Sequence, residues 1–130
     1  MRSELITFFE TYQNGFDKFD PSAIASHYAI PCSVLDVDGL QFFSSHADLL
    51  EKLSSNCHSM KGMGYSGSEF SIHEIGVLGT AAVSVDLGWR VQLESGLLDF
   101  RTLYICRKIE DQWQVFNAIV YEGVYDEVTS

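Results

Sequence analysis

Residues 81–109 read AAVSVDLGWRVQLESGLLDFRTLYICRKI and contain two long stretches rich in apolar residues. In the first stretch apolar and polar residues alternate, which is the pattern of a strand with one buried and one exposed face. The tripeptide Glu94-Ser95-Gly96 lies between the stretches and is typical of a tight turn. The segment therefore predicts a hairpin of two long antiparallel strands, at 81–93 and 97–109.

Two further strands extend this hairpin into a meander. The segments at about 69–77 and 112–121 are also rich in apolar residues, and they are separated from the hairpin only by Leu78-Gly79 and Glu110-Asp111. Short connections of this kind join antiparallel neighbours. The second half of the chain is therefore predicted to be a four-stranded antiparallel sheet.

The first half of the chain predicts helices. Apolar residues recur there at steps of three and four, at Leu5, Phe8, Phe9, Tyr12, Phe16 and Phe19. This spacing predicts an amphipathic helix that continues through Asn14-Gly15. Asp20-Pro21 is a typical helix start, and it predicts a short second helix that runs to about Tyr28 and stops before Pro31.

A short hairpin and a third helix come next. Residues 32–37 and 40–43 flank Asp38-Gly39, a dipeptide favoured in two-residue turns. Ser45 predicts the N-terminal cap of a helix that continues to about Cys57. Helices collected on one face of a curved antiparallel sheet form an α+β domain, and residues 1–130 are predicted to be one such domain.

Composition narrows the functional classes. The chain has 130 residues, of which 46% are hydrophobic and 20% charged, as is usual for a soluble globular domain. Its eight Lys and Arg residues are scattered and its formal charge is −10, so neither nucleic acid nor an anionic membrane is an expected partner. No signal peptide or membrane span is expected. The three widely spaced cysteines predict neither a disulfide framework nor a zinc site, so we expect a cytoplasmic protein with reduced thiols.

The last predicted strand is apolar on both sides. Period-two alternation would put Trp113, Val115, Ile119 and Tyr121 on one face and Phe116, Ala118 and Val120 on the other. The helices can cover only one face of a sheet. A second subunit packed on the outer face, forming a homodimer, is therefore predicted.

Three segments carry a resemblance to a known family: Phe-Phe-Glu-Thr-Tyr at 8–12, Ala-Ser-His-Tyr-Ala-Ile-Pro-Cys at 25–32 and Trp-Gln-Val at 113–115. In this order and spacing they resemble the NTF2-like superfamily, and more narrowly its SnoaL-like, ketosteroid isomerase-like bacterial branch. The resemblance implies a cystatin/NTF2-like α+β cone in which three helices and a curved sheet enclose a pocket, usually in a homodimer. The superfamily contains enzymes, transport factors and association domains, so fold alone does not decide function.

Tyr12 and Asp36 are the candidate catalytic pair. In position they resemble the tyrosine and the general-base aspartate of ketosteroid isomerase. A carboxyl group in an apolar pocket is suited to moving a proton next to a carbonyl, and a tyrosine can bond the developing oxyanion. The alternative interpretation is that Tyr12 belongs to the core and Asp36 to a turn. The isomerase's second acid falls near Leu103, where this chain has no carboxyl group.

Other patterns carry less chemistry. The charges at Asp86, Arg90, Asp99 and Arg101 resemble the Asp-Arg-Asp set of epoxide hydrolases, but ion pairs facing solvent or a dimer rim explain them as well. His46, His58 and His73 form no metal-ligand pattern. Residues 62–67 match G-x-G-x-x-G, but they follow a helix and precede a strand, the reverse of a dinucleotide site.

The sequence therefore predicts a homodimeric domain that binds a small, largely apolar organic molecule, without metal or cofactor. Proton transfer through Asp36, of an isomerase, cyclase or lyase type, is a further hypothesis. The alternative is a non-catalytic dimerisation or association module. The predicted pocket residues are Tyr12, Phe16, His27, Tyr28, Val34, Asp36, Leu87, Trp89, Leu103, Phe116 and Val120.

Overall fold

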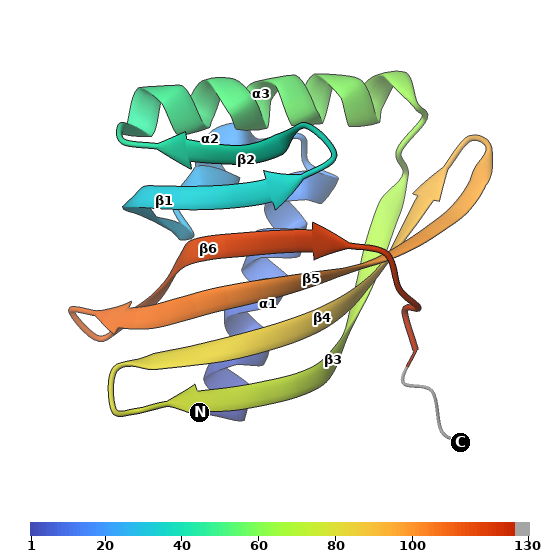
Figure 1. Cartoon of the computed structure of the whole chain (residues 1–130). Helices are drawn as coiled ribbons and strands as arrows, with labels where there is room; N and C mark the ends of the chain where they lie inside the picture. Colours follow the sequence, from blue (N-terminus) through green and yellow to red (C-terminus); the bar gives the residue numbers. More distant parts are fainter. Residues whose placement is uncertain (127–130) are drawn as a thin grey trace.

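Three helices and six strands are formed by residues 1–126, the part of the chain that the computed structural model describes (Figure 1). In chain order they are α1 (Arg2–Asp17), α2 (Pro21–Ala25), β1 (Tyr28–Asp36), β2 (Gly39–Phe43), α3 (His46–Gly62), β3 (Gly67–Leu78), β4 (Ala82–Leu93), β5 (Gly96–Ile109) and β6 (Gln112–Tyr121). The predicted α+β cone and its element order are confirmed. No helix within residues 1–126 is long and apolar enough to cross a membrane.

The strands form one curved sheet in the order β2-β1-β6-β5-β4-β3. The meander from β3 to β6 is antiparallel throughout, and β1 joins it in parallel to β6. In Figure 1 α1 lies behind the long strands, and α3 runs along β2 at the other end of the sheet. The helices therefore cover one face, here called the inner face, and leave the outer face uncovered.

The alternation that predicted β4 describes its two faces correctly. Its inner-face side chains are buried, at Val83, Val85, Leu87, Trp89, Val91 and Leu93. Ser84, Asp86 and Arg90 between them are only partly buried. Because successive side chains of a strand point to opposite faces, this one strand contributes both to the core beneath α1 and to the outer face.

The helix starts also follow the sequence. The Asp20 carboxylate accepts a hydrogen bond from the Ala23 amide, and the Ser45 hydroxyl accepts one from the Asp48 amide. These bonds satisfy N–H groups that have no partner within the first turn of a helix. The predicted capping residues of α2 and α3 are thus confirmed.

The second helix is shorter than predicted. It ends at Ala25, and Tyr28, which was expected in the helix, is instead the first residue of β1. The cause is pairing with β6, because the Val115 amide donates to the His27 carbonyl at 2.8 Å. Pro31 lies inside β1 rather than before it, where the β1–β6 register shifts between Tyr28 and Ser33 and no N–H donor is needed.

The predicted faces of β6 are wrong for part of the strand. Cys106 pairs with Val115 but Ile105 pairs with Asn117, so Phe116 is an extra residue that forms a β-bulge. Val115 and Ala118 are therefore both buried on the inner face, although they are three residues apart. A period-two pattern cannot represent such an insertion.

The segment after β6 crosses the outer face of β3 and β4. The Tyr125 carbonyl accepts hydrogen bonds from the Ser71 hydroxyl and, at 2.7 Å, from His73 Nε2. The Arg90 guanidinium lies 4.6 Å from the centre of the Tyr125 ring. A Cβ atom added at Gly88 would overlap the Tyr125 carbonyl, so the glycine permits this close approach.

We predict that Gly88→Ala lowers the free energy of unfolding by about 1–3 kcal/mol, the usual effect of overpacking. Displacement of Tyr125 should also speed hydrogen exchange of its amide. Urea denaturation and exchange measured by NMR test both effects. Gly62→Ala is the control, because nothing lies within 4 Å of its added Cβ. Unchanged stability with a protected Tyr125 amide would contradict the explanation.

Candidate functional site

A cavity of about 350 Å³ lies between the inner face of the sheet, α1 and α3. This volume is in the range of small-molecule sites in proteins. Most of its wall is apolar and is contributed by Phe16, Val34, Leu49, Leu53, Met60, Trp89, Val91, Leu93, Phe100, Ala118 and Val120. The lining residues come from α1, α3 and the strands of the sheet.

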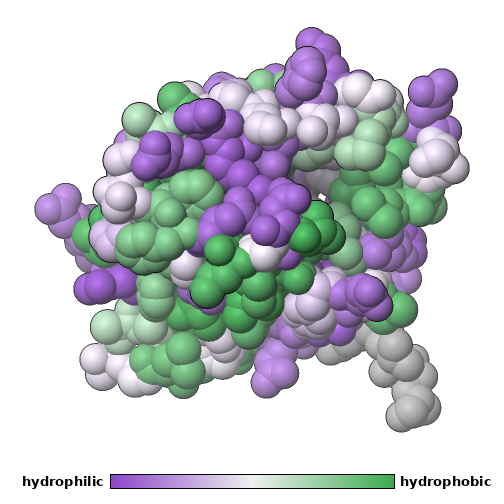
Figure 2. All heavy atoms as spheres, turned by 45° about the horizontal axis from the view of Figure 1, so that its top comes forward, coloured by the Kyte–Doolittle hydropathy of each residue, from purple (hydrophilic) through white to green (hydrophobic). Residues whose placement is uncertain are grey.

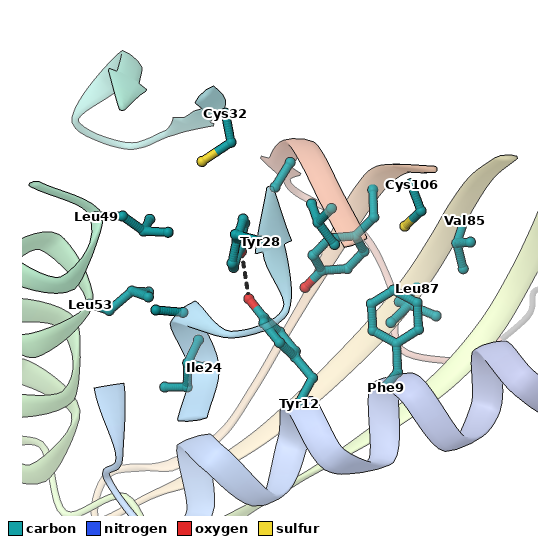
Figure 3. Close-up of a cluster of buried hydrophobic side chains, with 14 of the residues drawn as sticks. Phe9, Tyr12, Ile24, Tyr28, Cys32, Leu49, Leu53, Val85, Leu87 and Cys106 are labelled. Atoms are coloured by element: carbon teal, nitrogen blue, oxygen red, sulfur yellow. Dashed lines mark hydrogen bonds between the residues drawn. The ribbon is translucent and has the colours of Figure 1, made fainter. Parts of the chain in front are cut away.

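Three buried phenols form the polar part of the inner wall. Tyr12 on α1, Tyr28 on β1 and Tyr104 on β5 all line the cavity. The hydroxyl oxygens of Tyr12 and Tyr28 are 2.7 Å apart, and Figure 3 shows the two side chains pointing toward each other from separate elements. The Trp89 indole N–H donates to the Tyr104 hydroxyl at 3.1 Å. The phenols thus bring α1, β1 and β5 together around one group of hydroxyls.

These phenols are neutral hydrogen-bond donors. Burial is the main reason why the pKa of Tyr104 is raised to about 12 and why the pKa values of Tyr12 and Tyr28 are raised well above 10. In the Tyr12–Tyr28 pair one hydroxyl donates to the other, which leaves one proton of the pair for another acceptor. A carbonyl or hydroxyl oxygen of a ligand would be such an acceptor.

Asp36 lies on the wall of the same cavity, at the end of β1. Its Oδ1 accepts hydrogen bonds from Gln41 Nε2 at 2.8 Å and from the Asp38 amide at 2.9 Å. Its Oδ2 is 3.1 Å from Lys52 Nζ, and the two side chains are only 16% and 13% exposed. Lys52 Nζ is also 3.3 Å from Asp38 Oδ2. Lys52 is therefore shared between two carboxylates at the cavity edge.

One side of α3 presents polar groups to the cavity. Lys52, Asn56 and Ser59 are spaced by four and three residues, so they lie on one face of the helix, and all three line the cavity. Asn56 is partly buried. Its amide takes part in none of the hydrogen bonds found among residues 1–126. The amide is thus available to a ligand.

The cavity is reached past exposed apolar side chains. Val37 in the β1–β2 turn, Met63 after α3 and Leu98 on β5 line it and are 99%, 48% and 49% exposed. Figure 2 shows a hollow in the surface next to hydrophobic side chains, on the side where α3 ends. Apolar side chains therefore form part of the rim of the cavity.

Residues 3–123 match the family described as NTF2-like protein (DUF6841). The chain belongs to this NTF2-like family. A search of functionally curated proteins found no match.

Solved structures show the same fold at low identity. An NTF2-like protein of unknown function from Shewanella oneidensis is 17% identical, with a TM-score of 0.75 over 92% of this chain and 97% of that one. A ketosteroid isomerase-like protein from Erwinia carotovora atroseptica is 12% identical, with a TM-score of 0.68 over 91% and 92%. A protein from Xanthomonas campestris, provisionally named a calcium/calmodulin dependent protein kinase II association domain, is 13% identical, with a TM-score of 0.68 over 92% and 86%. These likenesses concern the fold alone.

Most residues predicted for the pocket of this NTF2-like domain line the cavity. The structure brings Tyr12 and Asp36 to one cavity together with Phe16, Tyr28, Val34, Trp89 and Val120. Both alternatives weighed for the catalytic pair also hold in part. Tyr12 packs in the aromatic core, against Phe9 and Tyr104, and the Asp36 carboxylate accepts a bond from the turn amide of Asp38.

Four predicted pocket residues lie elsewhere. Leu87 is fully buried in the core, beneath Phe9 (Figure 3). His27 borders a surface groove with Trp113, where Nδ1 donates to the Ala23 carbonyl and burial lowers the pKa of the imidazole.

Leu103 and Phe116 were predicted to face the cavity, but neither of them lines it. Thr102 and Tyr104 line the cavity, so Leu103 between them points to the outer face. Phe116 is the bulged residue of β6 and is absent from the cavity wall.

The charged pairs considered in the sequence do not join the cavity. Arg101 Nη2 lies 2.8 Å from Asp86 Oδ2, and Arg90 binds Asp99 through two bonds of 2.9 Å. Asp86 and Arg101 pair with outer-face neighbours on β4 and β5. They are ion pairs of the outer face, as the simpler interpretation predicted.

Sequence reasoning missed Lys52, Asn56, Thr102 and Tyr104 as cavity residues. Thr102 and Tyr104 flank Leu103, and the sequence was used there only to look for a second acid. Lys52 and Asn56 follow a helical spacing beside the apolar stripe of α3, and this spacing was a signal that could have identified them.

The free energy of unfolding is expected to fall as pH rises above about 10. Tyrosines of the unfolded chain ionise near that pH, whereas burial in the folded protein raises the pKa of Tyr104 to about 12 and raises the pKa values of Tyr12 and Tyr28 well above 10. The unfolded state therefore loses protons first and gains stability. Urea unfolding at about pH 9, 10 and 11 measures this loss. The protein is expected to be fully stable below about pH 10 and to lose stability as the pH rises toward about 12.

The Tyr104→Phe variant should show a shallower decline with pH, since one raised pKa is removed. Ultraviolet absorbance of tyrosinate follows the same ionisations in the folded protein. An equal slope in both proteins would show that Tyr104 is not protected from ionisation.

Proposed function

We propose that this protein binds a small, largely apolar organic molecule in the cavity between α1, α3 and the sheet. The observation that carries the proposal is a group of neutral phenols, Tyr12, Tyr28 and Tyr104, on the wall of an otherwise apolar cavity. If the cavity had no ligand, larger side chains that filled it would make the folded protein more stable. The phenols suit one ligand oxygen, and the aromatic wall suits a flat apolar body.

We further propose acid–base chemistry at Asp36, of the isomerase, cyclase or lyase type. A ligand carbonyl at Tyr12 would become an enolate when a proton on the adjacent carbon passes to the Asp36 carboxylate. The phenol then stabilises the oxyanion. Lys52 holds Asp36 Oδ2, so this oxygen accepts a proton only after the ion pair opens. Because Tyr12 and Asp36 line the same cavity, we also propose that the chain belongs to the SnoaL-like branch.

We propose that the protein forms a homodimer through the outer sheet face. Leu35, Leu40 and Phe42 are 39%, 74% and 70% exposed there. They continue through the pairing Leu35–Ile119–Leu103 across β1, β6 and β5. A second copy is the proposed occupant of this face. Each protomer carries a charge of −10, and the apolar strip lets two copies pack together without bringing their negative charges face to face.

The cysteines indicate the compartment in which the protein works. Cys32, Cys57 and Cys106 are buried free thiols, which supports a reducing compartment, and we propose the cytoplasm.

The alternative function is a non-catalytic association module. It is favoured by the likeness to the Xanthomonas campestris protein named as an association domain.

Bicyclic aromatic ketones are expected to raise the melting temperature of the protein. Tyr12→Phe should weaken their binding about tenfold, because one hydrogen bond to the ligand oxygen is worth about 1–1.5 kcal/mol. Calorimetric titration gives the affinities. A panel of such ketones that leaves the melting temperature unchanged would favour the association module.

Proton transfer has its own readout. Exchange of the ketone's adjacent C–H for deuterium, followed by NMR in heavy water, should be accelerated by the wild type and lost in Asp36→Asn. Asp111→Asn, in the β5–β6 turn, is the matched control. Equal exchange in Asp36→Asn would eliminate Asp36 as the base and leave ligand binding intact.

Sedimentation should show a dimer at micromolar concentration. Phe42→Glu places a charge in the apolar strip of both copies and should yield monomers, whereas Val77→Glu, at an exposed position near the end of β3, should not. A monomeric wild type would refute the proposed interface.

A further inference from the structure

We infer that the cavity selects uncharged ligands and rejects carboxylic acids, because carboxylates outnumber cations at its edge. The inference rests on the proposed ligand-binding function and concerns the class of molecule that the site accepts. It follows from the charges around Lys52 and from the polar groups that remain free.

Acidic side chains lie in and next to the cavity wall. Among the cavity-lining residues of the described chain, Asp36 and Lys52 are the charged ones. Asp38 adds a second carboxylate 3.3 Å from Lys52. On another side, the hydroxyl of the lining residue Tyr65 donates to Asp17 at 2.5 Å. One carboxylate therefore lies in the cavity wall and two lie next to it, and Lys52 is between Asp36 and Asp38.

Lys52 is already occupied as a partner for anions. Its Nζ lies between Asp36 Oδ2 and Asp38 Oδ2, and its side chain is 13% exposed. A ligand carboxylate that bound Lys52 would have to displace one of these groups. The displaced carboxylate would then be left unpaired in a poorly solvated place, a costly arrangement. A carboxylate bound elsewhere in the cavity would lose its hydration without gaining a cation.

The free polar groups of the cavity suit neutral oxygen and nitrogen atoms instead. The phenols are uncharged donors, and the Asn56 amide offers both a donor and an acceptor one turn after Lys52. An amide can bond a carbonyl or hydroxyl fully, but it cannot neutralise a carboxylate. The cavity is therefore equipped to recognise ketones, alcohols or amides attached to an apolar body.

The test compares two molecules of nearly equal shape. Methyl naphthyl ketone and naphthoate, substituted at the same ring position, differ chiefly in a methyl group replaced by a charged oxygen. At neutral pH naphthoate is ionised. Calorimetric titration of the full chain is expected to show at least about tenfold tighter binding of the ketone.

Asp38→Asn isolates the electrostatic cause. This change removes one carboxylate next to Lys52, and it leaves the lining residues unchanged. Asn-Gly is as favourable a turn dipeptide as Asp-Gly, so the hairpin should fold normally. The preference for the ketone is expected to shrink at least about threefold, whereas Asp111→Asn should leave it unchanged.

The outcomes separate the inference from the function on which it rests. If both molecules bind equally, or naphthoate binds more tightly, ligand binding stands and the charge selection is refuted. If neither binds, both proposals fail. If the ketone is preferred but Asp38→Asn does not alter the preference, the selection does not arise from the charges at Lys52, and the inference is wrong.

Discussion

A hydrogen bond between two buried phenols joins the first helix of this domain to its first strand beside the cavity. Tyr12 on α1 and Tyr28 on β1 are both buried, and their hydroxyls are 2.7 Å apart. A buried hydroxyl without a partner costs about 1–3 kcal/mol, so neither side chain can leave the other. The bond fixes α1 against β1 inside the core cluster, with Phe9 on one side of it and Leu49 and Leu53 on the other (Figure 3). Both phenols also line the cavity, so this bond helps to shape its wall.

Local patterns predicted the elements of the fold well, but single-residue irregularities escaped them. The alternation in 81–93 assigned every inner residue of β4, because an uninterrupted strand keeps its period. The same reasoning misplaced Phe116, because one bulged residue reverses the faces of all residues after it. Tyr28 was assigned to a helix because its partner in β6 lies almost ninety residues away in the chain. Long-range pairing of this kind leaves no local signal.

The candidate site was predictable where a resemblance or an apolar face pointed to it. Tyr12 and Asp36 were found in this way, and they do share a cavity. Lys52 and Asn56 were missed because a polar residue on an amphipathic helix is normally read as solvent-facing. On α3 the apolar stripe faces the core, and the residues beside it face a cavity instead of water. Whether a cavity exists depends on tertiary packing, which the helix sequence does not contain.

The acid–base proposal and the charge inference concern the same negative charge at the edge of the cavity. When Asp36 accepts a proton from a neutral ketone, the carboxylate at the cavity edge loses its charge and the ligand oxygen becomes negative. The charge thus moves away from Asp38 and Lys52 toward Tyr12, whose phenol is a neutral donor. An acidic substrate would add a second negative charge to the same cavity and oppose this movement. Under the two proposals, a site that moves one negative charge inward would favour a substrate that brings none, which is the selection inferred from the carboxylates around Lys52.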